Sequence, residues 1–326
     1  MALTAPEVPH LAGRDAALRE LGYRDWEAAW LTLVCLHSGV FTRPQLTEHH
    51  RCSTKPAHTF LSRLVDAGVA GEHPVPGMDN HLRFTHVFGR GLYRALGIEN
   101  VRHRRKAEDL VLFRRLLSLD HVVRHPGLPW LATEQEKVDH FTARGIRRDH
   151  LPSRIYGRPG KRTRRYFALK LPIAADEKSA TFVYVDPGRE TDTELQGWAK
   201  EHRPLWSRLR ELGTELHVAV VARTVAAQHA LSRKVAAWLT VPSSTSEPLT
   251  PEERETLAAA DAALDLALAH GDASPCAPWG GFNACRRLVI DLQKRDDMEA
   301  SEAGTRALID GYSTHHARHL APQSLA

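Results

Sequence analysis

The stretch WEAAWLTLVCLHSGVFTRPQLTEHHRCSTKPAHTFLSRLV, residues 26–65, decides how the first third of this 326-residue chain is expected to fold. Apolar residues recur at helical spacing over Trp26–Leu36 and again over Phe60–Val65. Between these two segments, Thr42 is placed to cap a short helix. Gly39 is placed to end the preceding one. The stretch therefore predicts three consecutive helices.

Two short β-like runs follow these helices, near residues 71–75 and 81–86. Turn-forming residues separate them, namely Pro76, Gly77, Asp79 and Asn80. Three helices and a hairpin in this order are typical of a winged helix-turn-helix, whose third helix enters the DNA major groove. The same pattern also serves as a protein-docking module, so both uses remain open at this point.

Polar and cationic residues on the expected third helix and hairpin are the first candidates for DNA contacts. They are Lys55, His58, Thr59, Ser62, Arg63 and Arg83. A second candidate surface lies downstream, because residues 144–165 contain nine Arg or Lys and a single acid, Asp149. Phosphate contacts dominate nucleic-acid affinity, and from this run we assign them to Arg158, Lys161, Arg162 and Arg164. The alternative is a solvated, arginine-rich surface loop.

Charge and cysteine usage narrow the class of protein. The net charge is +5 and the isoelectric point is near 9.1. The four cysteines are scattered and form no C-x-x-C pair, so no disulfide framework is expected, and a reducing compartment is favoured. No stretch approaches eighteen apolar residues, and the first residues lack an apolar signal region. We therefore expect a cytoplasmic protein with no membrane partner.

The rest of the chain alternates predicted helices and strands. Helices are expected at 103–119, 133–145, 192–212 and 225–239, and strands at 121–124, 164–171, 180–186 and 216–222. Residues 144–161 are expected to be an exposed loop. This order indicates an α+β or α/β fold, with a mixed sheet flanked by helices. We predict three parts: 1–100, a winged helix-turn-helix; 101–240, the sheet domain; and 241–326, a linker with tail helices at 251–270, 279–292 and 305–312 that dock on the sheet or form a dimer.

One helix, three strands, a helix and a fourth strand form the order of the restriction-endonuclease-like core. Such nucleases hold Mg²⁺ through carboxylates on adjacent strands and place a lysine beside them. The candidates here are Asp176 and Asp186, with Lys170 as the lysine, because Gly188 occupies the usual lysine position. The alternative is that Asp176 stabilises a turn and Asp186 caps a helix.

The sequence VYVDPGRET, residues 183–191, resembles the corresponding strand of the replication-relaxation family of plasmid and mobile-element proteins. In that family, and in the related mobilisation relaxases, a winged helix precedes a restriction-endonuclease-like domain. The resemblance implies Asp186 as a metal ligand. Tyr184 stands where the family has an acidic residue, so DNA binding is expected without strand cleavage.

The sequence thus predicts a DNA-binding protein of a bacterial plasmid or other mobile element, acting in replication, mobilisation or their regulation. The expected partners are double-stranded DNA and a second copy of the chain or other mobile-element proteins, with no cofactor. Two alternatives stay open. One is an active DNA nickase or relaxase that uses Mg²⁺, and the other is a dimeric transcription regulator or assembly factor.

Overall fold

The polypeptide divides into two units, one formed by residues 1–235 with 311–326 and the other by residues 236–310. A computed structural model describes residues 8–78, 82–157, 162–188, 192–239, 249–270, 272–302, 307–317 and 320. The first unit is a mixed α+β structure with small sheets, and the second is helical. The boundary expected near residue 100 falls inside the first unit.

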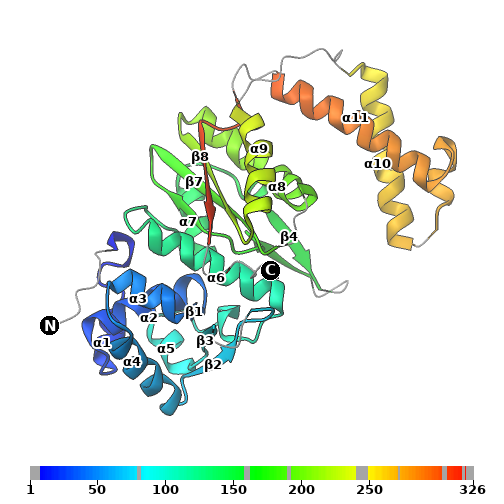
Figure 1. Cartoon of the computed structure of the whole chain (residues 1–326). Coiled ribbons are helices and arrows are strands. Elements are labelled where there is room, and N and C mark those ends of the chain that lie inside the picture. Colours follow the sequence, from blue (N-terminus) through cyan, green and yellow to red (C-terminus); the bar gives the residue numbers. More distant parts are fainter. Residues whose placement is uncertain are drawn as a thin grey trace. The chain divides into compact units, whose positions relative to one another are not determined.

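The first unit begins with helices packed around a three-stranded sheet (Figure 1). Its elements are α1 (Ala16–Glu20), α2 (Asp25–His37), β1 (Val40–Thr42), α3 (Arg43–His50), α4 (Thr54–Asp66), β2 (Ala70–Pro74), β3 (Arg83–Val87) and α5 (Arg90–Ala95). The strand order is β1-β3-β2, and both pairings are antiparallel. The three helices expected between Trp26 and Val65 are therefore confirmed.

The local signals that end and begin these helices act as expected. Gly39, after α2, has a φ of +74°, and a side chain there would meet the backbone of His103 at 2.7 Å. Thr42 caps α3 by accepting a hydrogen bond from the backbone N–H of Gln45 at 3.4 Å. The side chain of Gln45 accepts in turn from the N–H of Thr42 at 2.9 Å, which completes a capping box.

The rest of the first unit is built around a four-stranded mixed sheet. The elements here are α6 (Asp109–Arg124), α7 (Glu134–Ala143), β4 (Ser153–Tyr156), β5 (Thr163–Tyr166), β6 (Ile173–Ala175), β7 (Ser179–Asp186), α8 (Asp192–Glu211), β8 (Glu215–Ala222), α9 (Val225–Ala236) and β9 (Gly311–His316). The order is β6-β7-β8-β9, with β6 antiparallel to β7 and the other pairs parallel. The last residues of β7 and β8 are buried, which requires cover on both faces. Helices α6 and α8 contact these strands (Figure 1).

The fourth strand of this sheet comes from the end of the chain, which contradicts the helix predicted at residues 305–312. Residues 303–306 lie outside the described part, and β9 begins at Gly311. Strand β9 pairs with β8 so that Ala222 lies opposite His316. The chain thus leaves the first unit after α9, forms the helical unit, and returns to complete the sheet. Pairing over such a sequence distance leaves no local pattern.

Three further predictions in this region are wrong. The strand expected at 121–124 is the end of α6, because His121 and Val122 are buried on the helix and packing overrides the β-propensity of the valines. The strand expected at 164–171 ends at Tyr166, after which Phe167 and Lys170 adopt φ angles of +48° and +55°. The loop expected at 144–161 contains β4, which pairs with β5 in a separate two-stranded sheet.

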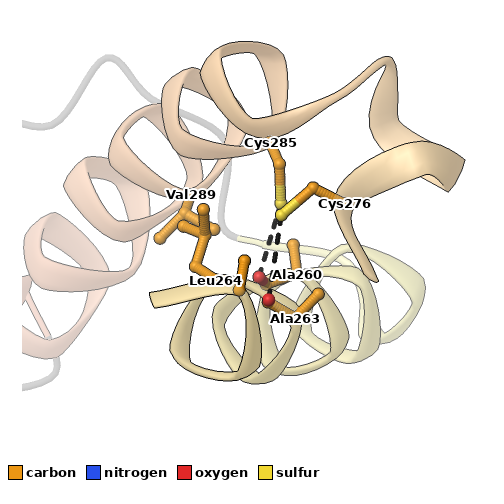
Figure 2. Close-up of a cluster of buried hydrophobic side chains, with 7 residues drawn as sticks. Ala260, Ala263, Leu264, Cys276, Cys285 and Val289 are labelled. Atoms are coloured by element: carbon orange, nitrogen blue, oxygen red, sulfur yellow. Dashed lines mark hydrogen bonds between the residues drawn. The ribbon is translucent and has the colours of Figure 1, made fainter. Parts of the chain in front are cut away.

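The helical unit is built on α10 (Pro251–His270) and α11 (Phe282–Glu302), joined by the short 3-10 helix η5 (Ser274–Trp279). Its buried cluster consists of Ala260, Ala263, Leu264, Ala267, Cys276, Cys285 and Val289 (Figure 2). The thiols donate to backbone carbonyls of α10: Cys276 to Ala263 at 3.7 Å and Cys285 to Ala260 at 3.4 Å. The small alanines let η5 and α11 approach α10 closely. The linker predicted at 241–249 lies almost wholly outside the described residues.

No helix in the ranges that the structure describes is long and apolar enough to cross a bilayer.

Candidate nucleic-acid interface

Helix α4 presents a polar face because four of its apolar residues turn inward; Val65, expected to be buried with them, is 38% exposed near the end of the helix. Its buried residues are Ala57, Phe60, Leu61 and Leu64. This spacing follows the 3.6-residue helical period, so the positions between them face solvent. Lys55, His58 and Thr59 are exposed, and Ser62 is partly exposed. Four of the predicted contact residues therefore lie together on one accessible surface, which we call the α4 face.

Arg63, predicted to belong to the same surface, is exposed on α4 and forms an ion pair with a buried carboxylate. Its guanidinium donates to both carboxylate oxygens of Glu27 in α2, Nη1 to Oε1 at 2.9 Å and Nη2 to Oε2 at 3.2 Å. Glu27 is 1% exposed and also accepts from the backbone N–H of Arg24 at 3.0 Å. A buried carboxylate needs such partners. Arg63 therefore anchors α4 to α2.

The β2–β3 hairpin follows α4. Residues 79–81, at its tip, lie outside the described part, together with the expected turn residues Asp79 and Asn80. Arg83 is exposed at the start of β3, and its Nη2 donates to the backbone carbonyl of Glu72 on the paired strand at 3.0 Å. The predicted contact Arg83 thus lies on the β2–β3 hairpin.

The second half of the arginine-rich run contains the paired strands β4 and β5, which we call the β4–β5 hairpin. Arg154 lies directly opposite Arg165, and each is held by an acid, Arg154 by Glu201 at 2.7 Å and Arg165 by Glu134 at 3.0 Å. Arg162 and Arg164 are exposed. Arg164 lies on the same side of the hairpin as its opposite residue Ile155, which is 56% exposed, whereas Arg162 directly precedes β5. The predicted contacts Arg158 and Lys161 lie outside the described residues.

The candidate catalytic residues do not converge. Asp176 precedes β7 and Asp186 ends it, so roughly 20 Å of strand separates them. Asp176 Oδ1 accepts from the backbone N–H groups of Ser179 and Lys178, each at 2.8 Å, and these bonds lower the pKa of its carboxyl. Asp176 is thus a turn residue, and no Mg²⁺ could bridge it and Asp186.

The other two positions of the expected metal site also serve different purposes. Lys170 is on an irregular segment after β5 and lines a cavity. Tyr184 is buried in the core, with its ring 5.4 Å from that of Trp198. In the part of the chain that the structure describes, no group of three or more His, Cys, Asp and Glu side chains could hold a metal ion. Asp186 itself is buried at the carboxyl end of β7, 1% exposed.

Two sets of buried polar residues were not expected from the sequence. His49 and His50 stand at the end of α3, where residues usually face solvent, yet both are buried, and His50 packs against Trp26 with ring centroids 5.3 Å apart. Burial lowers their pKa values to about 4 and about 3. Lys137 is also buried, on α7 four residues before Phe141, and its place on that apolar stripe was the available signal.

Comparisons of the chain with protein-family models, with curated proteins and with solved structures found no match. The family suggested by residues 183–191 therefore stays a prediction.

Proposed function

We propose that this chain binds duplex DNA as a protein of a plasmid or other mobile element, through a winged helix-turn-helix in its first unit. The observation that carries the proposal is the order α2-β1-α3-α4-β2-β3 with β1 and β2 flanking β3, combined with the polar α4 face. A recognition helix needs a buried apolar stripe and an exposed set of hydrogen-bond donors and acceptors, and α4 has both.

The β4–β5 hairpin supplies a second contact in this proposal. Arg162, directly before β5, and Arg164, within it, are both exposed, whereas Arg154 and Arg165 are engaged by acids. Exposed arginines that contact the phosphate backbone of DNA contribute affinity without base specificity. We assign Arg162 and Arg164 to phosphate binding.

The four-stranded sheet has the role of a nuclease-like scaffold without strand cleavage. Its order β6-β7-α8-β8 resembles a restriction-endonuclease-like core, which supports the proposal. The separation of Asp176 from Asp186 and the buried ring of Tyr184 give no support to the nickase alternative.

Binding is tested by selecting bound sequences from a random duplex library and then measuring affinity by fluorescence anisotropy at several salt concentrations. Lys55→Ala on α4 and Arg164→Ala on the hairpin are each expected to weaken binding about three- to tenfold, and each should lower the salt slope by about 1. Lys178→Ala is the matched control, because Lys178 is exposed in the turn before β7. Unchanged affinity in the Lys55→Ala, Arg164→Ala double variant, or no duplex binding at 50 mM salt, would refute the proposal.

A further inference from the structure

A cavity of about 660 Å³ lies within the first unit. One wall comes from the end of α2 and the segment after α5, including His37, Ile98 and His103. The other comes from α7 and the segment after β5, including Lys137 and Lys170. Small-molecule sites in proteins span about 300–1,000 Å³, so this volume admits an organic ligand.

The lining of the cavity carries an excess of positive charge. Five cationic residues contribute to it, namely Arg94, Lys137, Arg148, Arg165 and Lys170, and two acidic ones, Glu99 and Glu134. Both acids are already engaged, Glu99 by Arg94 at 3.4 Å and Glu134 by Arg165 at 3.0 Å. Cations therefore outnumber acids in the lining, and Lys137, Arg148 and Lys170 are among these cations.

Lys137 is the most informative of these residues because it is 3% exposed. Its Nζ donates to the backbone carbonyl of Leu171 at 2.7 Å and lies 5.9 Å from the ring centroid of Phe167. An ammonium group has three donors, and burying one against neutral partners costs free energy. Burial lowers the pKa of Lys137 to about 8, and the charge of Lys170 adds to this effect. An anion in the cavity would offset both the cost of burying the ammonium group of Lys137 and its repulsion by Lys170.

Lys170 reaches the cavity from a left-handed backbone conformation, with a φ of +55°. Residues other than glycine rarely adopt this region because the side chain crowds the backbone there. Its charge also contributes to lowering the pKa of the buried His103, after the larger effect of burial. The fold therefore brings positive charges together in this cavity, and a bound anion would reduce the repulsion between them.

The remaining lining suits the two parts of an organic phosphate. The N-terminus of the ten-residue helix α7 contributes its N-cap residue Thr133 together with Glu134 and Gln135, and a helix N-terminus favours anions. Leu131, Val138 and Phe167 provide apolar surface on the same wall. Phosphate groups fit the first feature and a ring system fits the second.

We propose that this cavity binds a small organic phosphate, with Lys137 and Lys170 contacting the phosphate oxygens and an apolar or aromatic group held against Phe167. This site is independent of the α4 face and of the proposed DNA binding.

Isothermal titration of the full chain with ATP, AMP, inorganic pyrophosphate and the uncharged nucleoside adenosine tests the proposal. ATP or AMP should bind saturably at one site per chain, and adenosine should bind at least tenfold more weakly. Lys137→Met and Lys170→Asn should each weaken nucleotide binding at least tenfold. Asparagine suits a left-handed backbone position, so Lys170→Asn keeps the fold even where Lys137→Met disturbs it.

Two controls separate this cavity from the other cationic surfaces. Lys178→Met removes an exposed lysine elsewhere on the unit, and Arg164→Ala removes a cation of the β4–β5 hairpin. Both should bind the nucleotides as the unmodified chain does. Equal affinity in Lys170→Asn and the unmodified chain would overturn the proposal. So would the absence of saturable binding of ATP, AMP and pyrophosphate at 1 mM, or a loss of binding in Arg164→Ala.

Discussion

Arg63→Ala should destabilise the first unit, and the affinity of the folded protein for DNA should stay the same. The substitution removes two hydrogen bonds to Glu27, at 2.9 and 3.2 Å, and leaves a carboxylate that is 1% exposed with the N–H of Arg24 as its remaining donor among the bonds described above. Loss of a partner from a buried ion pair costs about 3–5 kcal/mol. The side chain of Arg63 is 44% exposed, so water replaces part of what is lost. We therefore expect a loss of about 2 kcal/mol, the scale of hydrogen bonds to charged groups.

The assay is urea unfolding of the full chain, combined in a double-mutant cycle with Glu27→Gln. The pair should show a coupling free energy of about 1–2 kcal/mol. Lys55→Ala provides the comparison, because its side chain is exposed on the same helix and its loss should change stability by less than about 0.5 kcal/mol. The reasoning fails if Arg63→Ala and Glu27→Gln prove additive, or if Arg63→Ala weakens DNA binding at full stability.

Three further perturbations probe other parts of the chain. Leu264→Ala should lower the stability of the helical unit by about 2–3 kcal/mol, measured by calorimetry, whereas Leu268→Ala should not, because Leu264 is 8% exposed and Leu268 is 69% exposed. Asp120→Asn should speed amide hydrogen exchange in β9 relative to β8, because Asp120 Oδ2 accepts from His315 Nε2 at 2.7 Å and this bond ties β9 to α6; Asp139→Asn, on the exposed side of α7, should not. His202 is buried and its folded pKa is lowered to about 4 from 6.5, mainly by burial, so the unfolded chain binds a proton first as the pH falls. Its contribution to stability is complete above pH 6.5 and decreases by up to about 3 kcal/mol toward pH 4, so the difference between the urea midpoints at pH 7.5 and 5.0 should be smaller in His202→Gln than in the unmodified chain. Some difference should remain, because burial also lowers the pKa values of His49 and His50.

Elements with a complete local signal could be predicted from the sequence. Helix α7 begins where the N-cap residue Thr133 accepts from the N–H of Glu136 at 3.1 Å, a bond that a threonine three residues before a glutamate favours. Strand β7 is an apolar run ended by Pro187-Gly188, and α10 was predicted with the bounds observed, Pro251–His270. In each case the residues that specify the element lie within it or directly beside it, so no distant contact had to be known.

The site could be predicted only where the function of a residue depends on its own helix. The α4 face follows from a 3.6-residue pattern, and it was predicted. Arg63 has the right charge and helical position for that surface, but its partner Glu27 is 36 residues away on another helix. Asp176 and Asp186 are close in sequence, yet a strand lies between them and places them at opposite ends. Strand β9 joins β8 after the helical unit, and Lys137 and Lys170 meet at a cavity whose other wall comes from α2 and the segment after α5. Charge and spacing therefore predict which residues are able to bind a phosphate, whereas the tertiary pairing decides which of them are left to do so.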